Sequence, residues 1–352
     1  MRITPQMLSQ ATEQGVLRPG QGNALWAFLQ AQQADEPRFQ PAHILHYLGG
    51  LTAIGAMTLF MTLGWERLGG GGLLAVACLY VAIAAAATEW LVRRGQKLPA
   101  GLMSGLAVAL VPLAVYGLQR WMGWWADDGA RVLAYRDFHT HIDWRWLMME
   151  LAALAAGAVV LWRWKLPFGM LPVAVTLWYL SMDLVPALLM GEPQAFWSEQ
   201  GKRVSTAFGL CMLVGALWVD LRSVRRADFA FWLYVFGVLA FWGGLTSMES
   251  TSELGRLGYC AVNLVMIALG AMLSRRVFAV FGGLGVTLYL GHLSHTVFKD
   301  SLMFPVALTA LGLGLMACGV LWQRHAVAWG ARLRALLPVR LRDLIEHRAG
   351  AA

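Results

Sequence analysis

Charged residues are scarce in this chain. Only 14% of its 352 residues are Asp, Glu, Lys or Arg, while 58% are hydrophobic. Soluble globular domains carry roughly 25% charged residues, so this deficit excludes an ordinary soluble domain and places the chain among membrane proteins. Lysine is especially rare, with four residues against 24 arginines. Together with abundant Ala, Gly and Leu, this usage points to a GC-rich bacterial genome.

Cysteine is also rare, and all four cysteines lie inside apolar runs: Cys78, Cys211, Cys260 and Cys318. Their spacing fits neither a disulfide framework nor a zinc knuckle, so we interpret them as small packing residues. We expect no secretory signal peptide, because the opening MRITPQMLSQ is too polar for the apolar core of one. The first long apolar run begins near Ala42, and we expect it to remain as a transmembrane segment. No cofactor is predicted.

A nucleic-acid-binding motif is missing despite a net charge of +8. The arginines recur in short clusters between apolar runs, without the motifs that accompany nucleic-acid recognition. This distribution is typical of membrane topology. We therefore expect membrane lipids, and no nucleic acid, among the partners; a homo-oligomer or a protein partner stays open.

Long apolar segments are what the chain has in place of charge. A helix needs about 20 apolar residues to cross the hydrocarbon core of a bilayer. Ten segments qualify, which predicts an all-α, polytopic integral membrane helix bundle. The ten predicted spans are approximately 42–64, 71–92, 99–119, 145–162, 167–190, 204–221, 229–247, 257–274, 277–298 and 303–323.

Basic residues predict the orientation of this bundle. If the N-terminus is cytoplasmic, 19 of the 28 basic residues fall in the inner connections and the two tails. Every inner connection is then basic, as the positive-inside rule requires. We predict that both termini are cytoplasmic and that the protein lies in the bacterial inner membrane.

The two tails differ from the transmembrane bundle, which we assign to residues 42–323. Residues 1–40 resemble a cytoplasmic helical hairpin, in which Gly15 can end the first helix. Residues 324–352 mix leucines with arginines, and such a basic amphipathic segment typically lies along an anionic leaflet.

Ionisable residues inside the spans are the candidate functional groups, because their burial is costly unless they are paired or hydrated. From a helical rise of about 1.5 Å per residue, Glu150, Asp183 and His292 each lie roughly 9–10 Å from the outer end of a span. His295 shares a helix face with His292, and Lys299 follows one turn later. Asn263 is expected at comparable depth. We predict that these six residues form an outward-facing polar site.

The outer loop 126–144 adds His139 and His141 above Glu150. Three interpretations of the polar site remain open. The carboxylates can pair with Arg145, Lys299 or the histidines and fix helix packing. They can instead form a proton- or ion-coupled pathway, since His and carboxylate pairs change charge near neutral pH. A divalent metal site, with His139 and His141 as ligands, is the third interpretation.

Two further patterns concern packing. Gly282, Gly283 and Gly285 allow close helix approach. Prolines 167, 172 and 186 make the fifth span the best candidate for a kinked or broken helix. Two charges near inner boundaries are interpreted as structural: Glu89, four residues before Arg93 in a favourable order for an ion pair, and Asp220, which adjoins Arg222 and Arg225.

Two stretches carry a resemblance to a known family. They are EPRFQPAHILHYLGGLTAIGAM at 36–57 and LYLGHLSHTVFKDSLMFPVALTALGLGLM at 288–316. With the short helical N-terminus and the many spans, they resemble a bacterial family of predicted multi-pass membrane proteins catalogued as a domain of unknown function. The resemblance implies an inner-membrane protein and brings no activity or catalytic residue with it.

The function that these observations favour is transport or sensing of a small solute or ion through the outward-facing site. Glu150 and Asp183 would bind cations or protons, His292 would relay protons, and His295 with Lys299 would gate entry. One alternative is a structural or regulatory membrane subunit acting through its cytoplasmic tails. Another is an intramembrane enzyme acting on a lipid-linked substrate, although no triad or acyltransferase motif is recognisable and no catalytic residue is predicted.

Overall fold

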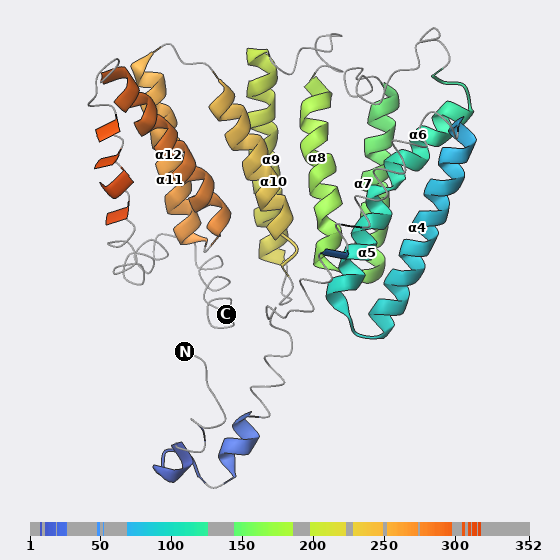
Figure 1. Cartoon of the computed structure of the whole chain (residues 1–352), viewed down its shortest axis with the longest axis horizontal. Coiled ribbons are helices and arrows are strands. Elements are labelled where there is room, and N and C mark those ends of the chain that lie inside the picture. Colours follow the sequence, from blue (N-terminus) through green and yellow to red (C-terminus); the bar gives the residue numbers. More distant parts are fainter. Residues whose placement is uncertain are drawn as a thin grey trace. The chain divides into compact units, whose positions relative to one another are not determined.

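The computed structural model describes most of the central part of the chain. The described residues are 69–125, 144–185, 198–222, 228–248, 252–273 and 275–297, with shorter pieces within 8–26, 48–52 and 305–317. All regular structure in these ranges is helical (Figure 1). The chain forms two compact units, Met1–Met57 and Thr58–Ala352.

The described part of the N-terminal unit includes short helical stretches at residues 11–13 and 21–26. The first ends at Gly15, whose φ of 75° lies in the left-handed region that glycine adopts at little cost. The N–H of Val16 then bonds the carbonyl of Ala11 at 2.9 Å. The predicted helix end at Gly15 is confirmed.

The second unit is a bundle of apolar helices. Its elements are α4 (Gly69–Arg93), α5 (Lys97–Ala109), α6 (Val111–Trp121), α7 (Trp144–Trp164), the short 3-10 helix η3 (Pro167–Gly169), α8 (Met170–Val185), α9 (Glu199–Arg222), α10 (Phe231–Ser247), α11 (Glu253–Met272) and α12 (Arg276–Val297). Six segments in the described residues are long and apolar enough to cross a membrane: Gly69–Arg93, Lys97–Trp121, Trp144–Trp164, Glu199–Arg222, Leu254–Met272 and Arg276–Ser294.

These helices correspond to eight of the ten predicted spans. The fifth and seventh predicted spans match shorter apolar helices, Pro167–Met182 and Phe231–Ser247. The first predicted span lies outside the described residues apart from residues 48, 49 and 52, and the tenth is described only in fragments. The all-helical membrane class is therefore confirmed, while the number ten stays a prediction.

A helix break occurs in the third predicted span. α5 ends at Ala109 and α6 begins at Val111, with Pro112 in the first turn of α6. Proline has no N–H to donate and crowds the preceding turn, which is why a helix breaks there. The fifth predicted span, by contrast, begins with η3 and continues as α8, an unbroken helix from Met170 to Val185. Pro172 lies in the first turn of α8, where proline is tolerated.

Short connections make two pairs of neighbouring helices antiparallel. Residues 94–96 join α4 to α5, and residues 273–275 join α11 to α12. α4 packs on α5 and α6, α7 packs on α6 and α8, and α10 packs on α8, α9 and α12 (Figure 1). The helices thus form a continuous series of contacts.

Glycines let several of these helices touch through their backbones. A Cβ on Gly117 would lie 2.7 Å from the backbone nitrogen of Leu74, so α6 and α4 are in backbone contact. A Cβ on Gly282 would lie 2.6 Å from the carbonyl oxygen of Asn263, which shows the same for α12 and α11. The predicted role of Gly282 in close packing is confirmed.

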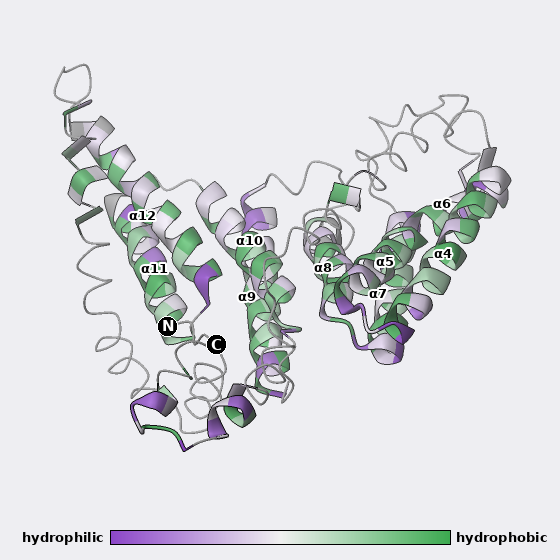
Figure 2. Cartoon of the chain, turned by 60° about the horizontal axis from the view of Figure 1, so that its bottom comes forward, coloured by the Kyte–Doolittle hydropathy of each residue, from purple (hydrophilic) through white to green (hydrophobic). Residues whose placement is uncertain are grey.

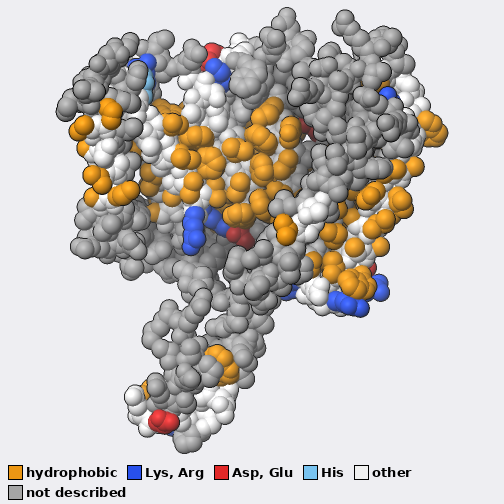
Figure 3. Space-filling model, viewed as in Figure 1, with side chains coloured by type: hydrophobic (Ala, Val, Ile, Leu, Met, Phe, Trp, Pro, Cys, Tyr) orange, Lys and Arg blue, Asp and Glu red, His pale blue; other side chains and the backbone are white. Residues whose placement is uncertain are grey.

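The buried core is apolar and aromatic, and the outside of the helices is apolar as well. Ala174, Met212, Tyr234, Val238 and Phe278 belong to one buried cluster that joins α8, α9, α10 and α12. Hydrophobic residues run along the helices, whereas hydrophilic residues gather mainly at helix ends (Figure 2). Space-filling atoms show the same apolar surface on the face in view (Figure 3). Such a surface suits a lipid environment.

One end of the bundle is basic. Arg163 at the end of α7 pairs with Glu89 near the end of α4, at 2.9 Å. Phe168 at the start of η3 contacts Trp232 at the start of α10, with ring centroids 5.6 Å apart. Arg275 before α12 pairs with Asp220 near the end of α9. These contacts gather on one face the described basic residues of the predicted inner connections, which are Arg93, Arg94, Lys97, Arg163, Lys165, Arg222, Arg275 and Arg276. We call this the basic face.

Candidate functional site

Glu150 is a buried carboxylate within α7. It lies six residues after Trp144, where α7 begins, and is 5% exposed. It shares a buried helix face with Ala153 and Gly157, so it points into the bundle and away from the surface. A carboxyl group in such a position can exchange a proton or bind a cation.

Gln119, which is 1% exposed, forms hydrogen bonds that join the end of α6 to the start of α7. Its Nε2 donates to the carbonyl oxygen of Arg145 at 3.0 Å, and its Oε1 accepts from Trp125 Nε1 at 3.3 Å. The guanidinium of Arg145 lies 4.3 Å from the centre of the Trp125 ring and donates to the carbonyl of Trp124 at 2.6 Å. Cation–π and hydrogen-bond contacts therefore hold a positive charge near the end of α7 that carries Glu150.

Asp183 belongs to α8, and its side chain lies outside the described residues. The register of α7 and α8 nevertheless fixes its level in the bundle. A Cβ on Gly157 would meet Val173, and a Cβ on Gly169 would lie 3.5 Å from Val160. Because the helices are antiparallel, Glu150 is level with residue 180, and Asp183 lies three residues farther out. This offset corresponds to roughly 4.5 Å along the axis.

Asn263 is fully buried and hydrogen-bonded between helices. Its Oδ1 accepts from Trp242 Nε1 at 3.0 Å, and its Nδ2 donates to the carbonyl oxygen of Tyr259 at 2.8 Å. A Cβ on Gly285 would clash with its amide group, so the absent side chain of Gly285 makes room for it. Asn263 thus ties α10 to α11 at the point where α12 packs against both.

His292 lies in α12 and is exposed. Its Nε2 lies 3.3 Å from the hydroxyl oxygen of Thr296 on the next turn. His292 is seven residues beyond Gly285, which places it roughly 10 Å along the helix from the level of Asn263. The expected common depth of Asn263 and His292 is therefore not found.

Four other predicted residues lie outside the description. The side chain of His295 is one, although its backbone belongs to α12. Lys299, His139 and His141 are the others. Among the described residues, no group of three or more His, Cys, Asp or Glu could hold a metal ion. The metal interpretation stays a prediction.

The described residues do not bring Glu150 and His292 together. The main packing partners of α7 are α5, α6 and α8, whereas those of α12 are α11 and α10. No hydrogen bond or ion pair between these two described side chains is present. The shared site of the six predicted residues remains a prediction, and Glu150 is the buried ionisable member that the structure describes.

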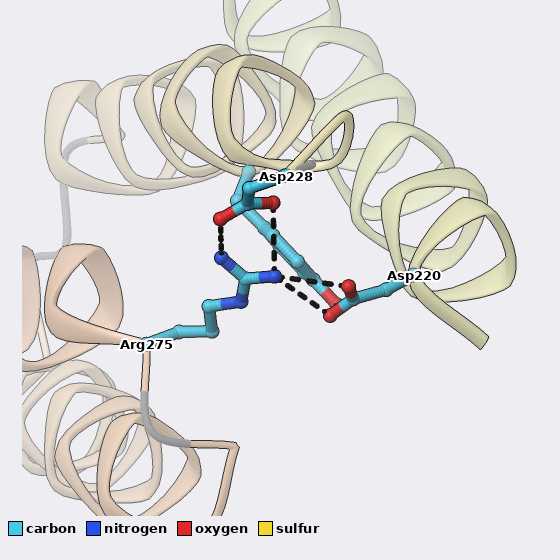
Figure 4. A network of polar contacts seen from close by, with 4 residues as sticks. Asp220, Asp228 and Arg275 are labelled. Atoms are coloured by element: carbon cyan, nitrogen blue, oxygen red, sulfur yellow. Dashed lines mark hydrogen bonds and ion pairs between the residues drawn. The ribbon is translucent and has the colours of Figure 1, made fainter. Parts of the chain in front are cut away.

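One described ion-pair network, centred on Arg275, was not predicted from the sequence. Arg275 lies between Asp220 near the end of α9 and Asp228 before α10 (Figure 4). Its Nη2 donates to Asp220 Oδ1 at 2.9 Å and to Asp228 Oδ1 at 3.1 Å, and its Nη1 also donates to Asp228. The structural interpretation of Asp220 is supported, but its described partner is Arg275, which is distant in sequence.

Aromatic and electrostatic contacts complete this network. The guanidinium of Arg275 lies 5.1 Å from the centre of the Tyr234 ring, and the Tyr234 hydroxyl donates to Asp220 at 3.3 Å. Burial alone would lower the pKa of Arg275, but the hydrogen bonds and negative charges of Asp228 and Asp220 outweigh it and raise the pKa. Arg275 therefore remains charged and ties the α11–α12 connection to α9 and α10. We call Arg275, Asp220, Asp228 and Tyr234 the Arg275 network.

These features define the class of the protein. Six apolar helices of membrane-spanning length, a basic face and buried polar residues between helices are the properties of a multi-pass helical membrane protein. Comparisons with protein-family models, with curated proteins and with solved structures gave no match.

Proposed function

We propose that this chain carries a small cation or proton through the outer half of a bacterial inner-membrane bundle, with Glu150 as its ion-binding group. The single observation that carries the proposal is the burial of the Glu150 carboxylate, 5% exposed, inside a membrane-spanning helix. Ionisable groups in this position are costly and mark ion pathways by default.

Asp183 is the second ion-binding carboxylate of the proposed pathway. The register of α7 and α8 supports this assignment, because positions 150 and 183 differ in level by about one helical turn. In the proposed pathway His292 relays protons at the outer mouth, and His295 with Lys299 gates entry. Asn263 has a packing role in this proposal, since Trp242 and Tyr259 already occupy its amide group.

The proposed topology has ten spans with both termini in the cytoplasm. It is supported by the basic face, because the positive-inside rule assigns such a face to the cytoplasm. Glu150 then lies toward the periplasm, since α7 ends on the basic face and begins at the opposite end. The proposal includes membership of the bacterial family of multi-pass membrane proteins that residues 36–57 and 288–316 resemble.

A flux assay on purified protein in liposomes tests the ion-binding role of Glu150. A pH gradient is imposed and internal pH is followed with a trapped dye, first with K⁺ and then with Na⁺ as the exchanging cation. We expect wild-type protein to dissipate the gradient and Glu150→Gln to reduce the rate at least tenfold, because the amide cannot exchange a proton. Glu150→Asp should retain part of the rate.

The matched control is Glu199→Gln. It makes the same chemical change at the exposed start of α9, where the Glu199 side chain is 50% exposed, and should leave flux unchanged. Unfolding temperatures in detergent show whether each variant is folded. Equal flux in wild-type and Glu150→Gln vesicles, or no flux of H⁺, K⁺ or Na⁺ in wild-type vesicles, would overturn the proposal.

A structural or regulatory subunit is the second candidate function. The Arg275 network and Asn263 favour it, because the described bonds of each tie one helix of the bundle to another. This function predicts that Asp183→Asn and His292→Ala leave cellular activity intact, whereas deletion of residues 1–40 or 324–352 abolishes it.

A further inference from the structure

Three helix ends meet at one corner of the basic face. α4 ends at Arg93, α5 begins at Lys97, and α7 ends at Trp164. Glu89 ties the ends of α4 and α7 together, since it accepts hydrogen bonds from Arg93 at 3.2 Å, from Arg163 at 2.9 Å and from Trp164 Nε1 at 2.9 Å. The side chains around Glu89 are thus held in place by bonds between helices.

This corner carries a surplus of positive charge. We call it the basic platform, and it consists of Trp90, Arg93, Arg94, Lys97, Arg163 and Lys165. The five cationic side chains are exposed, and Glu89 is the only acidic residue in segments 89–97 and 161–166. One carboxylate cannot neutralise five cations, so the platform attracts anions.

Exposed tryptophans place the basic platform at the level of lipid headgroups. Trp90 is 52% exposed and Trp162 is 78% exposed, although both lie in the last turn of a membrane-spanning helix. The guanidinium of Arg94 lies 4.1 Å from the centre of the Trp90 ring. Cationic and hydrophobic side chains adjoin at the lower right of Figure 3. Indole rings favour the boundary between headgroups and acyl chains, which a nucleic acid does not offer.

Lys165 adds an independent observation. Its φ of 53° lies in the left-handed region, where it ends α7, and it is the only described non-glycine residue with positive φ. Asn and Gly adopt this conformation more readily than Lys. A lysine in this position keeps a cation beside Arg163 despite the backbone preference, which points to a use for the charge.

We propose that the basic platform binds the phosphate headgroup of an anionic phospholipid in the adjoining leaflet. Arg94, Lys97 and Lys165 contact the phosphate oxygens, while Glu89 holds Arg93 and Arg163 in place and Trp90 and Trp162 pack on the glycerol and upper acyl chain. Basic pockets between transmembrane helices bind anionic headgroups in this way. The inference does not depend on the function proposed for Glu150.

Native mass spectrometry of the full chain in detergent tests the lipid site. Dioleoyl phosphatidylglycerol is titrated as the anionic lipid and dioleoyl phosphatidylcholine as the zwitterionic one. We expect tighter binding of the phosphatidylglycerol. The variant Lys165→Asn should weaken it about fivefold, and the triple variant Arg94→Gln/Lys97→Gln/Lys165→Asn should weaken it more than tenfold.

Lys165→Asn separates lipid binding from folding. Asparagine suits the left-handed backbone, so this variant should unfold at the wild-type temperature or above while binding less phosphatidylglycerol. Arg222→Gln is the matched control: Arg222 also stacks on an exposed tryptophan, 4.2 Å from the Trp218 ring centre, but outside the basic platform. It should change lipid affinity by less than twofold.

Three outcomes would overturn the inference. The first is equal binding of the two lipids by the wild-type chain. The second is wild-type affinity for phosphatidylglycerol in the triple variant, or a loss of that affinity in Arg222→Gln as large as the loss in the triple variant. The third is complete displacement of phosphatidylglycerol by millimolar inorganic phosphate, which would show that the platform binds soluble phosphate and not a lipid.

Discussion

Arg275 shows how much a single side chain can connect. It bonds two carboxylates and contacts one aromatic ring, and these groups come from α9, from α10 and from the short segment that precedes α10. The two carboxylates differ in burial, because the Asp220 side chain is 14% exposed and that of Asp228 is 41% exposed. Solvent screens an exposed ion pair far more than a buried one, so the two should differ in energy.

We therefore expect Asp220→Asn and Asp228→Asn to have unequal effects. Asp220→Asn should destabilise the protein by about 1–3 kcal/mol, because Arg275 and Tyr234 both lose a charged acceptor. Asp228→Asn should cost less than about 1 kcal/mol. Unfolding temperatures in detergent measure both. If the two variants melt alike, the Arg275 network does not depend on burial as argued.

At the residue scale, local pairs could be predicted and distant pairs could not. The Glu89–Arg93 ion pair was predicted from its four-residue spacing and is present at 3.2 Å. The pairing of Arg275 with Asp220 and Asp228 spans 55 and 47 residues. The sequence indicates only that Arg275, Asp220 and Asp228 lie near the boundaries of predicted spans. Which boundaries meet is decided by helix packing, and no local signal carries that information.

At the element scale, glycine positions on α12 differ sharply in their surroundings. A Cβ on Gly285 would clash with the amide of Asn263, whereas a Cβ on Gly283 would meet no atom within 4 Å. Gly285→Ala should therefore push α12 away from α11 and cost about 1–3 kcal/mol. Gly283→Ala should be neutral or stabilising by up to about 1 kcal/mol, because alanine favours helix over glycine.

The two variants form a matched pair, since they make the same change on one helix two residues apart. Unfolding temperature in detergent is the measurement, and fluorescence of the tryptophans reports whether Trp242 leaves Asn263. An equal melting temperature for Gly285→Ala and wild type would contradict the close packing described for α11 and α12.

Helix existence was easier to predict than helix continuity. The predicted span 145–162 agrees within two residues with α7, Trp144–Trp164, and the predicted span 277–298 agrees within one residue with α12, Arg276–Val297. The agreement is close because apolar runs flanked by charged residues define a span well. The break between α5 and α6 was missed, although Pro112 was a visible signal. In the fifth span, Pro167 and Pro172 lie at or near the starts of η3 and α8, where proline is tolerated, while Pro186 lies outside the described residues.

For the molecule as a whole, sidedness follows from the basic face. Arg93, Lys97, Arg163 and Arg275 lie toward one end, and the α6–α7 end lies opposite. Depth estimates from sequence could not resolve the candidate site further, because they treat every span as a straight rod perpendicular to the bilayer. The register between neighbouring helices, which separates the level of His292 from that of Asn263, can be read only from the contacts between those helices.

Single-cysteine labelling tests this sidedness. The native cysteines are first replaced by serine, and Gln96→Cys or Met122→Cys is introduced, since both positions are exposed. In oriented membrane vesicles, a membrane-impermeant maleimide should reach Gln96→Cys only from the cytoplasmic side and Met122→Cys only from the opposite side. Labelling of both from one side would refute the assignment of α5 and α6 to a single membrane-crossing segment that returns alongside α4.

The short connection between α11 and α12 bears on how the protein is made. Residues 273–275 are all that separates the two helices, which pack on each other along their length. Such a pair can enter the bilayer from the ribosome as one insertion unit and form its internal contacts at once. The guanidinium of Arg275 then bonds carboxylates that left the ribosome 55 and 47 residues earlier, so docking of this pair onto α9 and α10 follows its insertion.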